Sequence, residues 1–173
     1  MNIFLCGFMG SGKTTVGKAL STDLNMDFID LDKLIEIENN ESINEIFKNK
    51  GEDFFRNLEK EALKNVCKND NQVVSLGGGA VLKQENVDII KANGTLIFLE
   101  VEAKTVLKRL KNDTSRPLLN VDNKEAVIEK MLQERTPIYK NNADFTVNAN
   151  KNSKNTASFI KKIIKIWKNW FTL

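Results

Sequence analysis

The sequence predicts one α/β domain, a three-layer α/β/α sandwich in which helices cover both faces of a five-stranded parallel sheet. Short β-rich runs alternate along the chain with longer segments of helical periodicity, which is typical of strand–helix–strand crossovers. The chain has 173 residues and no internal repeat, and this length suits a single domain. Its composition, 41% hydrophobic and 28% charged, is that of an ordinary globular protein.

Local patterns predict the strands and helices in order. Five apolar or β-rich runs are expected to be strands, over residues 2–7, 27–30, 72–76, 95–101 and 144–148. The segments expected to be helices cover residues 13–25, 41–50, 52–69, 83–93, 103–111, 124–140 and 153–170. In the first helix Val16, Leu20 and Leu24 recur every fourth residue and form one apolar face. Ligands of such folds bind beyond the carboxyl ends of the strands, so we expect the site there.

The last expected helix, 153–170, has a broad apolar stripe bordered by lysines. A basic amphipathic helix can lie on a membrane surface. A three-layer fold, however, needs a cover on that face of the sheet. We therefore expect this helix to pack on the sheet, and we expect no membrane partner.

Composition excludes several classes of function. The chain has no histidine, which excludes Ser-His-Asp hydrolysis, Cys-His proteolysis and histidine-ligated metal sites. Cys6 and Cys67 suggest neither a disulfide framework nor a zinc site, and the N-terminus lacks a secretory pattern, so we expect a cytoplasmic location. The net charge of +3 is too small to indicate a nucleic-acid partner.

Residues 7–14, GFMGSGKT, match the pattern G-x-x-x-x-G-K-[ST] between an expected strand and an expected helix. Glycines in this motif let backbone N–H groups wrap a polyphosphate, and the following helix N-terminus adds positive charge. Lys13 is expected to contact the β- and γ-phosphates, and the Thr14 hydroxyl to ligate Mg²⁺. The residues expected to bind ATP in this loop are Gly10, Ser11, Gly12, Lys13, Thr14 and Thr15.

Two carboxylates, Asp30 and Asp32, follow the second expected strand. A magnesium–nucleotide site needs an acidic group, usually acting through water, and a kinase needs a group that accepts or orients the proton of the attacking hydroxyl. Both carboxylates are candidates for these roles. The alternative for Asp32 is a helix N-cap.

Three glycines, Gly77, Gly78 and Gly79, follow the third expected strand. Glycine costs backbone entropy, which is justified where a ligand approaches the main chain or where N–H groups converge on an anion. The alternative is a plain turn between a strand and a helix.

Only four of the 26 basic residues are arginines, so 26 − 4 = 22 are lysines. An arginine in such a chain indicates a need for a planar fork that grips carboxylate or phosphate, although a surface salt bridge is the alternative. Arg56 and Arg135 are candidates to clamp an anionic acceptor. Arg116 lies in a polar loop, about residues 111–124, that we expect to close over the γ-phosphate as a lid. Arg109 is expected either to stack on adenine or to be an ordinary exposed helix arginine.

Over essentially its whole length the chain resembles the shikimate kinases. The segments that carry the resemblance are GFMGSGKTTVGKAL, IDLD, FFRNLE, SLGGGA, SRPLL and ERTPIY. The resemblance implies a small P-loop kinase with strand order 2-3-1-4-5, which uses ATP to phosphorylate the 3-hydroxyl of shikimate in the route to chorismate. We expect one domain over residues 1–173, with a substrate-binding helical segment at about residues 32–62, and we expect a monomer.

The resemblance also assigns the acceptor site. It places Asp32 at the shikimate hydroxyls, Arg56 and Arg135 at the shikimate carboxylate, and the glycines Gly77–Gly79 at the other polar edge of the substrate.

For the nucleotide, the resemblance assigns Arg116 to the ATP phosphates and Asp30 with Thr14 to Mg²⁺. With Lys13 and Asp32, Arg116 makes up the expected catalytic set. The family usually has an arginine and a proline in the loop after the last strand, whereas residues 148–153 read NANKNS here. No side chain of this loop is therefore assigned to adenine.

Two alternative functions differ in class. The first is a related small-molecule P-loop kinase, such as one for gluconate, and the arginine pair, the glycine triplet and the IDLD segment argue against it. The second is a regulator that binds nucleotide or shikimate without catalysis, and the presence of Lys13, Asp32 and Arg116 argues against it.

Overall fold

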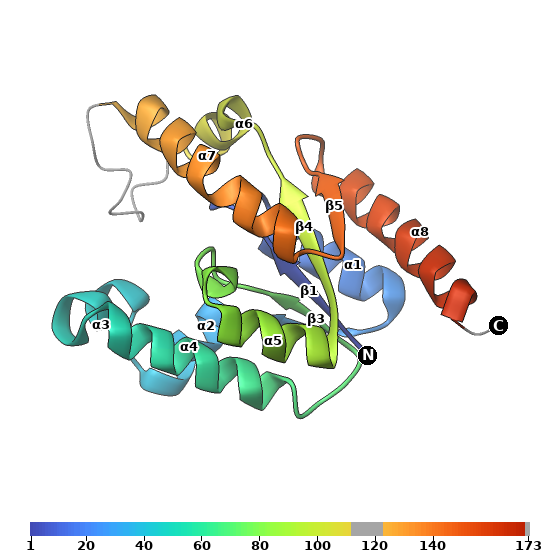
Figure 1. Cartoon of the computed structure of the whole chain (residues 1–173), viewed down its shortest axis with the longest axis horizontal. Helices are drawn as coiled ribbons and strands as arrows, with labels where there is room; N and C mark the ends of the chain where they lie inside the picture. Colours follow the sequence, from blue (N-terminus) through green and yellow to red (C-terminus); the bar gives the residue numbers. More distant parts are fainter. Residues whose placement is uncertain (112–122, 172–173) are drawn as a thin grey trace.

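One parallel sheet of five strands forms the centre of the molecule (Figure 1). The computed structural model describes residues 1–111 and 123–171. The strands are β1 (Asn2–Cys6), β2 (Asp27–Asp30), β3 (Gln72–Ser75), β4 (Gly94–Glu100) and β5 (Phe145–Asn148). They pair in the order β2-β3-β1-β4-β5, and every pair is parallel. The expected α/β class and strand order 2-3-1-4-5 are confirmed.

Helices cover the sheet on both sides (Figure 1). They are α1 (Lys13–Leu24), α2 (Leu31–Asn39), α3 (Ile43–Lys50), α4 (Glu52–Val66), α5 (Gln84–Asn93), α6 (Ala103–Arg109), α7 (Lys124–Asn142) and α8 (Ser153–Phe171). A 3₁₀ turn, η1 (Ala80–Leu82), precedes α5. Helices α1 and α8 pack together on one face of the sheet, and α2, α4 and α5 pack on the other.

The central strand β1 divides the core in two, because successive side chains of a strand point to opposite faces. Ile3 and Leu5 belong to the apolar cluster under α1 and α8, whereas Phe4 and Cys6 belong to the cluster under α2, α4 and α5. All four side chains are fully buried. This continuous apolar run is typical of a parallel strand that is covered on both faces.

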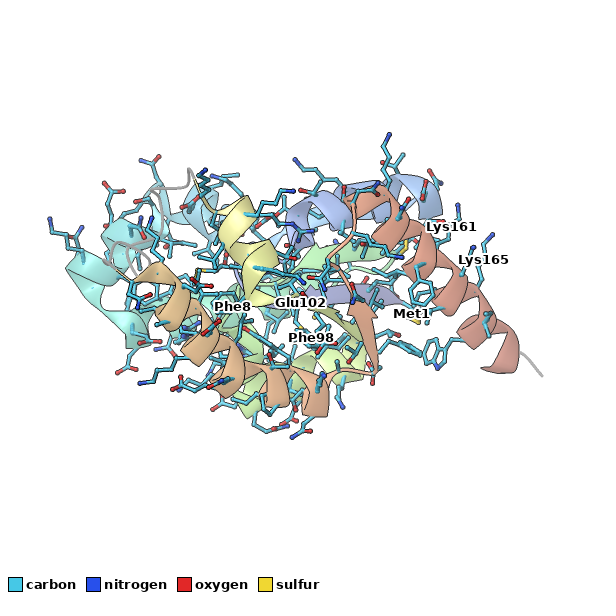
Figure 2. All side chains as sticks on the ribbon, turned by 90° about the horizontal axis from the view of Figure 1, so that it is seen from above. Met1, Phe8, Phe98, Glu102, Lys161 and Lys165 are labelled. Atoms are coloured by element: carbon cyan, nitrogen blue, oxygen red, sulfur yellow. The ribbon has the colours of Figure 1, made fainter. Side chains whose placement is uncertain are left out.

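The closing helix α8 packs on the sheet, as expected. Ala157, Ile160 and Ile164 are buried in the same apolar cluster as Ile3 and Leu5. Lys165 is exposed and points away from the sheet (Figure 2). Among the described residues, no helix combines the length and the apolarity needed to cross a membrane.

The structure adds helix α2, for which the sequence analysis gave no bounds. Leu31 and Ile35 are fully buried at four-residue spacing, which gives this helix an apolar contact with the core. The Ile-Glu-Ile-Glu run at residues 35–38 alternates like a strand and hides that spacing. The helix ends at Asn40, which has a left-handed backbone (φ 51°).

Helix α7 runs to Asn142, two residues beyond the expected end, and contains Pro137. Proline removes one helical N–H donor, but the helix continues past it. Arg135 lies inside this helix, seven residues before its last residue, Asn142. Residues 112–122 of the expected lid, which include Arg116, lie outside the described residues.

Candidate active site

The candidate site residues follow β1, β2 and β3, which are neighbours in the sheet. The P-loop, residues 7–14, follows β1, Asp30 ends β2, and Gly77–Gly79 follow β3. Because parallel strands end at the same edge of a sheet, these segments meet there, as the sequence analysis expects for a ligand site.

The P-loop has the turns that its glycines allow. Gly10 (φ 74°) and Gly12 (φ 93°) have left-handed backbones, which other residues rarely adopt. The Lys13 Nζ donates hydrogen bonds to the carbonyl oxygens of Gly7 (2.9 Å) and Phe8 (3.3 Å), so the ammonium lies over the start of the loop. The Ser11 hydroxyl is buried and has no hydrogen-bond partner among the described residues.

The two residues predicted to hold Mg²⁺ are in direct contact. The Thr14 hydroxyl donates a 2.7 Å hydrogen bond to Asp30 Oδ2. The other oxygen, Asp30 Oδ1, accepts the Lys33 N–H at 3.3 Å and caps α2. The N-cap alternative for Asp32 is therefore wrong, because Asp30 is the cap and Asp32 lies in the first turn of the helix.

The glycine triplet makes room for other side chains of the site. A Cβ built on Gly77 would lie 2.7 Å from Asp32 Oδ1 and 2.8 Å from Glu59 Oε1. On Gly79 it would lie 2.6 Å from both terminal nitrogens of Arg56. These contacts are far tighter than side chains tolerate. Asp32, Glu59 and Arg56 therefore occupy the space that Cβ atoms at Gly77 and Gly79 would need. Contact of this turn with a ligand stays a prediction.

Two carboxylates hold Arg56 in place. Its Nη1 donates to Glu59 Oε2 (2.9 Å), while its Nη2 (3.0 Å) and Nε (3.2 Å) donate to Glu52 Oε1. Burial lowers the pKa of Arg56, but the charge of Glu59 and the hydrogen bonds outweigh this and leave the pKa raised. Burial raises the pKa of Glu59, and the Arg56 charge offsets only part of that effect.

Sequence reasoning missed Glu59. It stands on the apolar stripe of α4, among Phe55, Ala62 and Val66, and is fully buried. A charged residue on a buried stripe is rare unless it is paired. The position of Glu59 on the apolar stripe could therefore have indicated a paired, buried carboxylate. One of its oxygens, Oε1, has no hydrogen-bond partner among the described residues and faces Gly77.

The glycine turn also contacts α7. The Tyr139 hydroxyl donates a 2.6 Å hydrogen bond to the Gly78 carbonyl oxygen. Arg135 is four residues earlier on the same helix, and its side chain acts to lower the pKa of that hydroxyl, against the larger effect of burial. The turn thus contacts Arg56 at Gly79 and Tyr139 at Gly78.

Arg109 joins two loops. Its Nη1 donates to the carbonyl oxygens of Gly10 (3.0 Å) and Ser11 (3.1 Å), and its Nη2 to those of Ala149 (2.7 Å) and Lys151 (3.0 Å). Partial burial lowers its pKa. Arg109 is exposed on its helix, as the alternative expects, and it also connects the P-loop to the loop after β5. Stacking on adenine stays a prediction.

A family model for shikimate kinase matches residues 9–167 of the chain. A shikimate kinase from a Sulfurihydrogenibium species is 42% identical over 163 residues, which cover 94% of this chain and 95% of that relative. One from Caldicellulosiruptor saccharolyticus is 44% identical over 165 residues, with 95% and 94% covered.

A solved structure of a shikimate kinase from Acinetobacter baumannii in complex with shikimate has a TM-score of 0.91 to this fold at 34% identity. The superposition covers 96% of this chain and 94% of that one. These similarities extend over nearly the whole chain and confirm the expected family and activity. The chain belongs to the shikimate kinase family, whose members are ATP-dependent kinases that phosphorylate shikimate.

Proposed function

We propose that the edge of the sheet beyond β1, β2 and β3 is the active site, where the γ-phosphoryl group of ATP passes to the 3-hydroxyl of shikimate. One observation carries this proposal. A Cβ built on Gly78 would lie 3.8 Å from the Gly7 carbonyl oxygen, so the glycine turn lies directly against the start of the P-loop. The proposed acceptor residues and the proposed phosphate residues therefore border one space.

The P-loop binds the phosphates of ATP in this proposal. Its backbone N–H groups and the α1 N-terminus attract the negative charge, and Lys13 neutralises charge on the β- and γ-phosphates. The buried Ser11 hydroxyl supplies a further hydrogen bond. Arg109 stacks on adenine from the position where it joins the P-loop to residues 149–151. Arg116, outside the described residues, is assigned to the phosphates. The full set proposed for ATP is Gly10, Ser11, Gly12, Lys13, Thr14, Thr15, Arg109 and Arg116.

Thr14 and Asp30 fit a Mg²⁺ ion. Both offer hard oxygen donors, and their oxygens are 2.7 Å apart beside the phosphate loop. Mg²⁺ retains several waters and is usually held by few protein oxygens together with phosphates. We assign Thr14 to the ion directly and Asp30 through water. When bound, Mg²⁺ neutralises charge on the β- and γ-phosphate oxygens.

On the acceptor side, Arg56 and Arg135 bind the shikimate carboxylate, and Gly77–Gly79 border the rest of the molecule. Asp32 orients the 3-hydroxyl and accepts its proton as the oxygen attacks the γ-phosphorus in line. Glu59 holds Arg56 in the plane that a bidentate contact with a carboxylate requires.

The protein acts as a monomer in the cytoplasm in this proposal. Both cysteines of the chain, Cys6 and Cys67, are free thiols, which is common in a reducing compartment. The two alternative functions, a gluconate-type kinase and a non-catalytic regulator, are arms of the test below.

A coupled assay of ADP release tests the proposal. We expect turnover with shikimate and little with gluconate or with no acceptor. Lys13→Ala and Asp32→Asn should each abolish turnover while the far-UV circular dichroism spectrum is retained. Retention of more than about a tenth of kcat by Asp32→Asn, a loss under about 1.4 kcal/mol, would contradict its role. ADP release that is independent of shikimate in the wild type would contradict the acceptor assignment.

A further inference from the structure

Tyr139, the single tyrosine of the chain, is buried beside the proposed acceptor site, and the sequence analysis gave it no role. It is fully buried on α7, and its ring stacks on Phe98 of β4 with centroids 5.1 Å apart. Figure 2 labels Phe98 beside α7. The stacking fixes the ring, so the hydroxyl position is fixed as well.

The hydroxyl has two polar neighbours. It donates to the Gly78 carbonyl oxygen at 2.6 Å and also interacts with the Arg135 side chain. The carbonyls of Gly77 and Gly79 accept backbone N–H groups of the turn, from Ala80 (3.2 Å) and Leu82 (3.0 Å). Tyr139 thus donates the hydrogen bond to the carbonyl oxygen of Gly78, the residue between them.

Burial raises the pKa of Tyr139 to about 12, although the Arg135 charge favours the phenolate. The group is therefore protonated at neutral pH and remains a donor. The hydroxyl donates its hydrogen bond to the Gly78 carbonyl oxygen, which leaves the lone pairs of the hydroxyl oxygen for the Arg135 side chain. A phenylalanine would keep the ring and lose both interactions.

We propose that Tyr139 is a positioning residue that ties Arg135 to the glycine turn, so that the proposed carboxylate-binding arginine keeps a fixed distance from the rest of the acceptor site. The inference rests on the proposed role of Arg135. Residues 135 and 139 lie one turn apart on the same helical face, and the hydroxyl connects that face to the turn after β3. The expected consequence is selective, because the hydroxyl donates to the Gly78 carbonyl oxygen and not to a P-loop atom.

Tyr139→Phe tests the inference by removing one oxygen. We expect the KM for shikimate to rise about tenfold, the size of one or two lost hydrogen bonds, while the KM for ATP changes less than about twofold. Asn142→Ala is the matched control. Its Nδ2 donates to the Val81 carbonyl oxygen (3.3 Å), so this variant also loses one hydrogen bond between α7 and the segment after β3, about two helical turns beyond Arg135. The control should leave the KM for shikimate within about twofold, since one weak hydrogen bond is lost.

An equal rise in the KM for shikimate in both variants would show that general docking of α7 matters, and would overturn the inference. The double variant Arg135→Lys/Tyr139→Phe gives a second criterion. If Tyr139 acts through Arg135, adding Tyr139→Phe to Arg135→Lys should raise the KM for shikimate by less than about twofold. If the rise in the KM for shikimate in the double variant equals the product of the rises in the two single variants, the inference is overturned.

The two proposals fail in different ways. If Arg135→Lys leaves the KM for shikimate at the wild-type value, the proposed carboxylate site is wrong, and the inference about Tyr139 falls with it. If Arg135→Lys raises that KM and Tyr139→Phe does not, the proposed function stands and only the inference about Tyr139 is overturned. Calorimetric titration of shikimate into each folded variant separates lost binding from lost turnover.

Discussion

The Thr14 hydroxyl and the Asp30 carboxylate are joined by a 2.7 Å hydrogen bond, which links the P-loop to the end of β2. The same carboxylate caps α2 through the Lys33 N–H. Asp32 lies in the first turn of that helix. One aspartate thus connects the proposed metal site to the element that carries the proposed catalytic carboxylate.

Asp30→Asn should separate the charge of this residue from its capping role. An asparagine side chain still accepts the Lys33 N–H and caps a helix about as well as aspartate, so the melting temperature should change little. The lost negative charge should raise the Mg²⁺ concentration for half-maximal rate by about tenfold, the scale of one charge-assisted contact. Rates measured against Mg²⁺ at fixed ATP give this value. An unchanged Mg²⁺ dependence would remove Asp30 from the metal site.

Gly79→Ala should weaken shikimate binding, because its Cβ would lie 2.6 Å from both Arg56 terminal nitrogens and must displace them. We expect a rise in the KM for shikimate of at least about tenfold, with the KM for ATP little changed. A KM for shikimate at the wild-type value would show that space at Gly79 is not needed.

The sequence predicted the strand ends and the motifs that follow them, because local periodicity and residue type determine both. It did not predict what the motifs contact. Tyr139 meets Gly78 across 61 residues, and Arg109 meets Gly10 across 99. Such contacts depend on how α7 and α6 pack, and no local pattern encodes that.

The same limit explains one other difference. The sequence analysis offered Asp32 as a helix cap, whereas Asp30 is the cap, because β2 ends at Asp30 and α2 begins at Leu31. Close approach of a ligand to the glycine triplet stays a prediction, and the structure adds that Asp32, Glu59 and Arg56 lie against Gly77 and Gly79.

Arg109→Lys should weaken ATP binding without affecting shikimate. The guanidinium donates to four carbonyl oxygens in two loops, and an ammonium with three donors at one point cannot span both pairs. The KM for ATP should rise about fivefold or more, and the KM for shikimate should stay within about twofold. Lys104→Ala is the control on the same helix, because its ion pair with Glu102 is exposed and contributes little. Equal KM values for ATP in Arg109→Lys and the wild type would show that the link between the loops is dispensable.

Arg56→Lys should raise the KM for shikimate by about 10-fold or more, because an ammonium cannot hold both carboxylate oxygens in one plane and a charge-assisted hydrogen bond is worth about 1.5–3 kcal/mol. Arg135→Lys is expected to change the same constant in the same direction. The control is Glu52→Gln, which alters only the exposed partner of Arg56. The KM for ATP should change little in all three variants. Wild-type affinity for shikimate in both lysine variants would contradict the carboxylate clamp.

Arg56→Lys should also change how stability depends on pH, through Glu59. The pKa of this buried carboxyl is already raised by burial, which the Arg56 charge partly offsets. A lysine at position 56 that pairs less well with Glu59 should raise the pKa of this carboxyl further. A raised pKa in the folded state means that stability is fully present below the unfolded pKa, about 4.3, and is lost as the pH rises through the folded value. Urea unfolding should therefore show a larger loss of stability, relative to wild type, at pH 8 than at pH 5. A loss of stability of equal size at both pH values would mean that Arg56 does not influence the pKa of Glu59.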